Sequence, residues 1–251
     1  EYITIPVSVL VPPATFGLPS SGHLEIVTCT ISSPDGEGPS ETIQASLVVE
    51  ESRDFTTRLS DADGNELAPI AASDDRPVLN MVREDTLLEI YNRGNIDMQM
   101  SVTIRLSDST WGLEAILNPE STNPFPITVL DGGASIEVSI EAGSMISILA
   151  TSIAPPTASM GDRALLTFRT TEGQQLTVID SSRFILQPRL EISLQAPESL
   201  EILAGEFAEF SIDLSNQGNV RLDLSWAFTG TAEGWSIGLQ SISPSFIEPN
   251  Q

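Results

Sequence analysis

The acidic segment around Asp61 contains the strongest candidate for a chemical site. Asp61, Asp63 and Asn65 place side-chain oxygens at alternate positions, as at the start of a calcium-binding loop, because hard cations prefer oxygen ligands. The rest of the segment differs from a calcium-binding loop that starts at Asp61. Its glycine, Gly64, is not at the sixth position, and Ala72 occupies the twelfth position, where a glutamate is expected. An Asp-Gly-Asn run is also an ordinary hairpin turn. The segment therefore has two interpretations, a turn or a calcium site.

The chain lacks the residue types for nucleophilic or zinc chemistry. His23 is the only histidine, and the serines of its loop are too close in sequence to form a catalytic triad with it. Cys29 is the only cysteine and lies in an apolar segment, where a small buried side chain is expected in preference to a reactive thiol. One histidine and one cysteine do not complete a zinc site without carboxylates. We therefore expect no enzymatic activity, no disulfide and no cofactor other than Ca²⁺.

The charge balance argues against partners that are polyanions. The 251 residues include 35 acidic and 11 basic residues, and every basic residue is arginine, so the net charge is −24. Such a surface repels nucleic acid and anionic lipid. Hydrophobic residues make up 40% of the chain, which is enough for a packed core, and no apolar stretch is long enough to predict a membrane span.

Alternation of apolar and polar residues predicts β-strands through most of the chain. In residues 96–105 Ile, Met, Met, Val and Ile alternate with polar side chains, which is the pattern of a strand with one buried face. Similar alternation occurs at 3–11, 136–140, 190–194 and 220–228. Clusters of Gly, Pro, Asp and Ser separate these segments, and no amphipathic helix of three turns is evident. Many short strands with turns between them predict an all-β chain of tandem immunoglobulin-like antiparallel β-sandwiches.

Two segments 124 positions apart share one pattern. An Asn-x-Gly-Asn motif separates two alternating strands, and a tryptophan follows it; the equivalent residues are Asn92, Gly94, Asn95 and Trp111 in one copy and Asn216, Gly218, Asn219 and Trp235 in the other. In such a turn the glycine is expected to supply a positive φ, and the asparagine side chains are expected to hydrogen-bond the turn backbone. The tryptophan is expected to cap the core of a sandwich, with sugar stacking as the alternative.

This arrangement of motifs resembles a known group of extracellular domains. A strand ending in Asn-x-Gly-Asn, an alternating strand, a tryptophan and a later strand that enters a proline-bearing loop are similar to the Ig-like repeats of bacterial and archaeal surface proteins. These include the α-galactosidase-associated module and a related cell-adhesion domain. The resemblance covers residues 78–187 and, as a first half, the last part of the chain. It implies an Ig-like fold and a role as a spacer or adhesive unit.

The repeat also predicts how the chain is divided. Residues 78–187 form one complete Ig-like domain, preceded by a connecting strand and the acidic turn at 53–77. Residues 188–251 correspond to the first half of a domain and are expected to stop before the strand that matches 136–140. Residues 1–52 correspond to a second half, which could complete the C-terminal half of a neighbouring chain. In the alternatives, the chain is a segment cut from a longer array, or each end is a small complete β domain.

These features together predict a non-enzymatic structural protein outside the cell, a spacer, stalk or filament component at a cell surface. Its expected partners are neighbouring repeats or other copies of itself in head-to-tail contact, with no nucleic acid and no direct membrane span. The alternative is a non-catalytic accessory module, binding carbohydrate or a surface, of a secreted carbohydrate-active enzyme.

Overall fold

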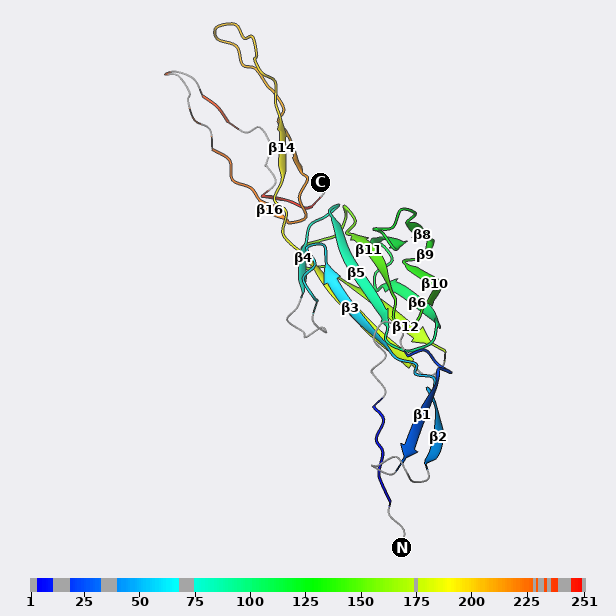
Figure 1. Ribbon diagram of the computed structural model, residues 1–251. Helices are drawn as coiled ribbons and strands as arrows, with labels where there is room; N and C mark the ends of the chain where they lie inside the picture. Colours follow the sequence, from blue (N-terminus) through cyan, green and yellow to red (C-terminus); the bar gives the residue numbers. More distant parts are fainter. Residues whose placement is uncertain are drawn as a thin grey trace.

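The computed structural model describes residues 4–10, 19–32, 40–67, 75–173, 176–227, 229, 233, 236–238 and 245–249. All regular secondary structure in these residues is β-strand, which confirms the all-β prediction. Two sheets form a central sandwich between Phe55 and Leu186, with a short strand hairpin before it and a longer, thinner unit after it (Figure 1).

The two sheets of the sandwich are antiparallel except at one edge. One sheet has six strands, in the order β4 (Arg76–Val78), β13 (Leu176–Leu186), β12 (Arg163–Glu172), β6 (Met98–Leu106), β10 (Gly133–Ile140) and β9 (Val129–Leu130). The other has five, in the order β3 (Phe55–Asp61), β5 (Arg83–Asn92), β11 (Met145–Ile153), β7 (Gly112–Leu117) and β8 (Phe125–Ile127). Among the strands of the described residues, only β4 and β13 pair in parallel.

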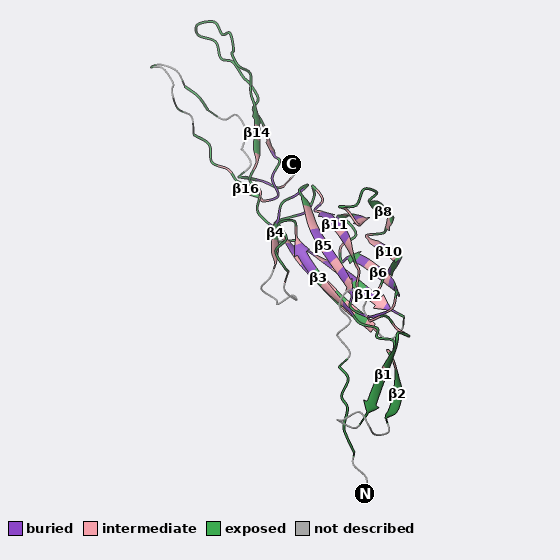
Figure 2. Cartoon of the chain, in the orientation of Figure 1, coloured by how far each residue is buried: buried purple, intermediate pink, exposed green. Residues whose placement is uncertain are grey.

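The core lies between these sheets and follows the alternation of the sequence. In β6 the side chains of Met98, Met100, Val102 and Ile104 are fully buried, as their period-two spacing predicts. Phe168 and Phe184 meet them from β12 and β13, and Leu88, Ile90 and Ile148 come from the opposite sheet. Buried residues are concentrated in this sandwich, whereas both end units are mostly exposed (Figure 2).

The segment at 53–77, expected to connect two domains, supplies an edge strand to each sheet. β3 pairs with β5, and β4 pairs with β13. Phe55 and Leu59 are buried because alternate residues of β3 face the core. The sandwich in the structure therefore begins at Phe55.

Six short strands lie outside the sandwich: β1 (Leu24–Ile31) with β2 (Glu41–Val48), β14 (Ile192–Gln195) with β15 (Asp213–Asn216), and β16 (Leu222–Asp223) with β17 (Phe246–Ile247). The strands expected at 3–11 and 220–228 are not formed to that extent. Residues 4–10 have no strand structure, and only Leu222 and Asp223 pair in the second segment. Few neighbouring strands flank these segments, so few ladder hydrogen bonds are available to them.

Three strand pairs of the end units have the same register as pairs of the sandwich. The pair Leu24–Val48 of β1–β2 corresponds to Arg163–Ile185 of β12–β13. The pair Ile192–Asn216 of β14–β15 corresponds to Phe55–Asn92 of β3–β5. The pair Leu222–Ile247 of β16–β17 corresponds to Met98–Ile140 of β6–β10. Ile247 thus corresponds to Ile140. The expectation that the C-terminal unit stops before this strand is wrong. The connection before β17 is shorter than the one before β10, so the constant offset of 124 positions does not extend to this strand.

Candidate functional site: the Asn-x-Gly-Asn junctions

The first Asn-x-Gly-Asn motif lies against the segment that connects the β1–β2 hairpin to the sandwich. We call the contact of residues 50–54 with residues 92–95 the first junction. The Asn95 side-chain oxygen accepts a hydrogen bond from Ser52 N at 2.7 Å, and its side-chain nitrogen donates to the Glu50 carbonyl at 2.9 Å. The Asn95 backbone N–H donates to the Ser52 carbonyl at 3.0 Å. Asn95 is buried, so these bonds hold the linker where water competes little.

The second motif makes the same contacts with the segment that leaves the sandwich. In this second junction, residues 187–191 lie against residues 216–219. The Asn219 side-chain oxygen accepts from Arg189 N at 2.6 Å, and its side-chain nitrogen donates to the Gln187 carbonyl at 2.8 Å. The Asn219 backbone N–H donates to the Arg189 carbonyl at 3.0 Å. Each of these bonds has its equivalent in the first junction.

Within each motif the first asparagine fixes the turn. The Asn92 side-chain oxygen accepts from Gly94 N at 2.9 Å, and its side-chain nitrogen donates to the Ile96 carbonyl at 2.8 Å. Asn216 makes the same two bonds in the second motif, at 3.0 and 2.8 Å. The prediction that the asparagine side chains hydrogen-bond the turn backbone is therefore confirmed for the first asparagine of each motif. It is wrong for the second, because the side chains of Asn95 and Asn219 bond the linkers instead.

Glycine is required in both motifs by the close approach of the linker. Neither Gly94 nor Gly218 adopts a positive φ, so the expectation that they supply a left-handed conformation is wrong. A Cβ atom at Gly94 would lie 2.3 Å from the Ser52 carbonyl oxygen, and one at Gly218 would lie 2.1 Å from that of Arg189. Any side chain would displace the linker. The glycine therefore makes room for the segment that binds there.

The segment before each strand hairpin also contacts the motif. Ser21, shortly before β1, donates its backbone N–H to the Asn95 carbonyl at 3.2 Å. Met160, at the same distance before β12, donates to the Asn219 carbonyl at 3.3 Å. The hairpin and its linker are thus bound at equivalent atoms in both junctions.

One further asparagine is buried in the second junction. Asn80 accepts a hydrogen bond from the Asn219 side-chain nitrogen at 2.7 Å. Its own side-chain nitrogen donates to the carbonyls of Pro155 and Ala158, both at 3.0 Å. Asn80 thereby connects the second motif to the loop after β11.

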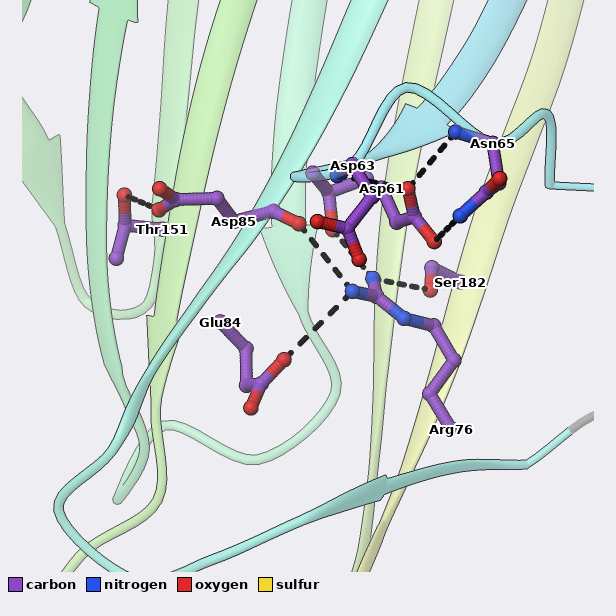
Figure 3. Close-up of polar contacts among 9 residues, drawn as sticks. Asp61, Asp63, Asn65, Arg76, Glu84, Asp85, Thr151 and Ser182 are labelled. Carbon is purple, nitrogen blue, oxygen red and sulfur yellow. Dashed lines mark hydrogen bonds and ion pairs between the residues drawn. The ribbon is translucent and has the colours of Figure 1, made fainter.

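Asp61 of the candidate calcium site is the last residue of β3, and Asp63 and Asn65 lie in the turn that follows (Figure 3). The Asp61 carboxylate accepts hydrogen bonds from the backbone N–H of Asp63 and Asn65 at 3.0 and 2.9 Å, and from the Asn65 side-chain nitrogen at 3.0 Å. These bonds, chiefly that of the Asn65 side chain, lower the pKa of Asp61. In the part of the chain that the structure describes, no three His, Cys, Asp or Glu side chains are grouped to hold a metal ion. The turn uses the Asp61 oxygens, and calcium binding remains a prediction.

A partly buried arginine lies close to this turn (Figure 3). Arg76 donates hydrogen bonds to the hydroxyls of Thr86 and Ser182 at 2.9 and 3.3 Å, and to the Asp85 carbonyl at 3.3 Å. The Glu84 carboxylate lies 3.7 Å from its guanidinium. Burial lowers the pKa of Arg76, and the neighbouring carboxylates oppose that change. The cluster pairs a buried cation with acceptors and so has a structural explanation.

The other predicted residues are found in three different settings. Trp111 is 3% exposed and stacks on Phe184 with ring centroids 6.1 Å apart, so it is a core residue and cannot serve as an exposed sugar platform. Trp235 lies outside the described residues. His23 is exposed, with Nε2 2.9 Å from a carboxylate oxygen of Glu25. The expectation that Cys29 is buried is wrong, because among the described residues no second sheet covers the β1–β2 hairpin.

No protein-family model matches the chain, and no curated protein sequence matches it either. Among solved structures, the chain is similar to the major pilin subunit BcpA of Bacillus cereus, at 9% identity over 76% of this chain and 63% of the pilin, with a TM-score of 0.37. It is also similar to a family 123 glycoside hydrolase from Clostridium perfringens, at 10% identity over 53% of this chain and 27% of the hydrolase, with a TM-score of 0.33. A third similarity is to the collagen binding subdomain of the Enterococcus faecalis surface protein ACE, at 9% identity over 41% of this chain and 87% of the subdomain, with a TM-score of 0.25. The chain spans less than two thirds of the pilin and of the hydrolase.

In the part of the chain that the structure describes, no helix is long and apolar enough to cross a membrane.

Proposed function

We propose that this chain is a structural spacer outside the cell, part of a stalk or filament in which consecutive β-sandwich units are held at fixed positions. The observation that supports this function is the equivalence of the two junctions. At each one, the same side-chain and backbone atoms of an Asn-x-Gly-Asn motif bind the linker through bonds of nearly equal length.

Such junctions give a chain of units a defined geometry. A linker whose backbone groups are hydrogen-bonded only to water can sample many conformations. Here the amide and carbonyl groups of the linkers are bonded to buried asparagines, and the hairpin before each linker is bound to the same motif. When each unit contacts only its neighbours, one repeated junction produces an array with a constant step between units.

The proposed spacer has no catalytic role. The polar cluster around Arg76 consists of groups that hydrogen-bond one another, and the carboxylate of Asp61 accepts hydrogen bonds from its own turn. The extracellular location is supported by the resemblance of the motifs to surface-protein repeats. The strongly acidic composition fits a protein that does not bind polyanions.

The test is whether the units tumble together. ¹⁵N relaxation of the 1–251 chain should give one common correlation time, with an elongated diffusion tensor, for the hairpin, the sandwich and the C-terminal unit. In Asn95→Ala the hairpin should acquire a shorter correlation time, and in Asn219→Ala the C-terminal unit should do so. Asn65→Ala, which changes an exposed asparagine of a turn, is the matched control and should leave the common tumbling unchanged. Independent tumbling of the units in the wild-type chain would refute the spacer function.

A further inference from the structure

The hairpin before the sandwich exposes a face whose equivalent is buried in the sandwich. β1–β2 has the register of β12–β13, so Cys29 corresponds to Phe168 and Ile31 to Thr170. Phe168 and Thr170 are fully buried, whereas Cys29 is exposed and Ile31 is 55% exposed. Alternate residues of β1 starting at Val27 therefore form a core-type face that no other sheet of the described residues covers. We call this face the head surface.

The C-terminal unit has the complementary exposed residues. β16 has the register of β6, so Trp226, which follows it, corresponds to Val102. Val102 is fully buried, and Trp226 is 36% exposed. Ile212, the counterpart of buried Leu88 in β5, is also partly exposed. We call the face formed by β15, β16 and the residues up to Trp226 the tail surface.

The sandwich shows how the two surfaces fit each other. There β12 pairs with β6, and Thr170 lies opposite Val102. β1 pairs only with β2, and β16 only with β17, so in the described residues each lacks the neighbour that its counterpart has in the sandwich. β1 corresponds to β12 and β16 corresponds to β6, and each has an unpaired edge. The two strands could therefore form the ladder with each other that β12 and β6 form in the sandwich.

These two surfaces cannot meet within one molecule. The β1–β2 hairpin and the β14–β17 unit lie at opposite ends of the sandwich (Figure 1). Both are anchored there by the junctions, which bind the linkers at residues 50–54 and 187–191. Within the described residues, therefore, neither surface covers the other.

We propose that copies of this chain associate head to tail: β1 of one copy pairs with the β16 segment of the next, Ile31 opposite Trp226, and the two end units together form a sandwich like the central one. The occupant of each surface is a second copy of the chain. Because the contact is heterologous, it propagates into an open chain of molecules unless the rotation between copies closes a ring. This inference goes beyond the spacer function, which requires only that the junctions are rigid.

Single-ended variants test the contact. Ile31→Asp places a charge in the head surface, and Trp226→Asp places one in the tail surface; each variant alone should be monomeric by analytical ultracentrifugation at concentrations where the wild type associates. An equimolar mixture of the two should form a 1:1 dimer, because the intact tail of one fits the intact head of the other. Ile26→Asp is the matched control, since Ile26 is also 55% exposed in β1 but lies on the opposite face, and it should associate like the wild type. A monomeric wild type, or association that Ile31→Asp leaves intact, would overturn the proposal without affecting the spacer function.

Cys29 gives a second measurement in the unmodified chain. Its thiol should react with a disulfide reagent at the rate of an exposed thiol in dilute, dissociated protein, and roughly tenfold or more slowly once the head surface is covered. Ile31→Asp should react at the fast rate at every concentration, and the melting temperature of the sandwich should be unchanged, which shows that the variant is folded. Association without protection of Cys29 would mean that a different surface is used and would refute the proposed pairing.

Discussion

Asn80 and Asn219 are 139 residues apart in the sequence and share a buried side-chain hydrogen bond of 2.7 Å across the boundary between the sandwich and the unit that follows it. The Asn219 nitrogen divides its two donors between Asn80 and the Gln187 carbonyl, and the Asn80 nitrogen binds the loop after β11. Three separate segments are therefore positioned by one pair of amide side chains.

This pair should be energetically coupled. We expect Asn80→Ala and Asn219→Ala each to lower the free energy of unfolding by about 1–3 kcal/mol, because each leaves buried backbone groups without a partner. The double variant should lose less than the sum of the two, with a coupling energy of roughly 0.5–3 kcal/mol. Urea unfolding of the wild type and the three variants gives this cycle, and strict additivity would contradict the role assigned to the pair.

The two motif glycines should tolerate no side chain. Gly94→Ala and Gly218→Ala would place Cβ atoms well inside contact distance of linker carbonyl oxygens, so we expect each to cost about 1–3 kcal/mol and to free the adjacent unit. Gly112→Ala is the control, since its Cβ would meet Ile153 at an ordinary 3.4 Å in a strand. Thermal unfolding and ¹⁵N relaxation measure the two effects, and wild-type behaviour of Gly94→Ala would refute the close-approach explanation.

Trp111→Ala should strongly destabilise the sandwich. It removes a buried ring that stacks on Phe184, and the cavity should cost about 3–5 kcal/mol. Trp111→Phe should recover part of that loss. A value below 1 kcal/mol for the alanine variant would mean that the ring does not contribute to the core.

The hydrogen bonds of the Asp61 carboxylate predict that the stability of the folded chain depends on pH. Hydrogen bonds lower the pKa of Asp61 in the folded chain, so its contribution to stability is complete above the unfolded pKa of about 3.9 and is lost as the pH falls through the lower folded value. Asp61→Asn removes this titration. As the pH falls from neutral through the folded pKa of Asp61, the melting temperature of the variant should therefore decrease less than that of the wild type. If the melting temperatures of both proteins decrease equally with pH, the role given to the Asp61 carboxylate is contradicted.

Chelation separates the two interpretations of the same turn. Because Asp61 uses its oxygens for Asp63 and Asn65, we expect the melting temperature to be the same in EDTA and in millimolar Ca²⁺. If Asp61, Asp63 and Asn65 instead hold calcium, EDTA should lower the melting temperature and Asp63→Ala should abolish that difference.

Local patterns in the sequence predicted the fold well. The alternation at Met98–Ile104 fixed which side chains of β6 are buried, because a one-residue change of phase would expose all of them. The spacing of Trp111 after its motif also indicated a core position, and the structure agrees.

Long-range contacts limited what the sequence could predict about the junctions. The Asn-x-Gly-Asn motif predicts a turn with a positive φ at its glycine, since nothing near Gly94 in the sequence indicates that the Ser52 carbonyl lies against it. The burial of Cys29 was expected from its apolar neighbours, whereas burial depends on a second sheet that the hairpin does not itself supply. The asparagine pair at Asn80 was missed because no local pattern connects it with Asn219.

The positions of the two linkers decide how a pulling force would pass through the sandwich. The chain enters at Phe55, the start of β3, and leaves at Leu186, the end of β13. These points are near opposite ends of β12, since Arg53 pairs with Glu172 while Leu186 is bonded to Asp162. Tension would therefore load β3 and β13 lengthwise, in shear against β5 and β12, so that many ladder hydrogen bonds must break together instead of one after another. The same strand arrangement that forms the core would thus give the molecule its mechanical strength.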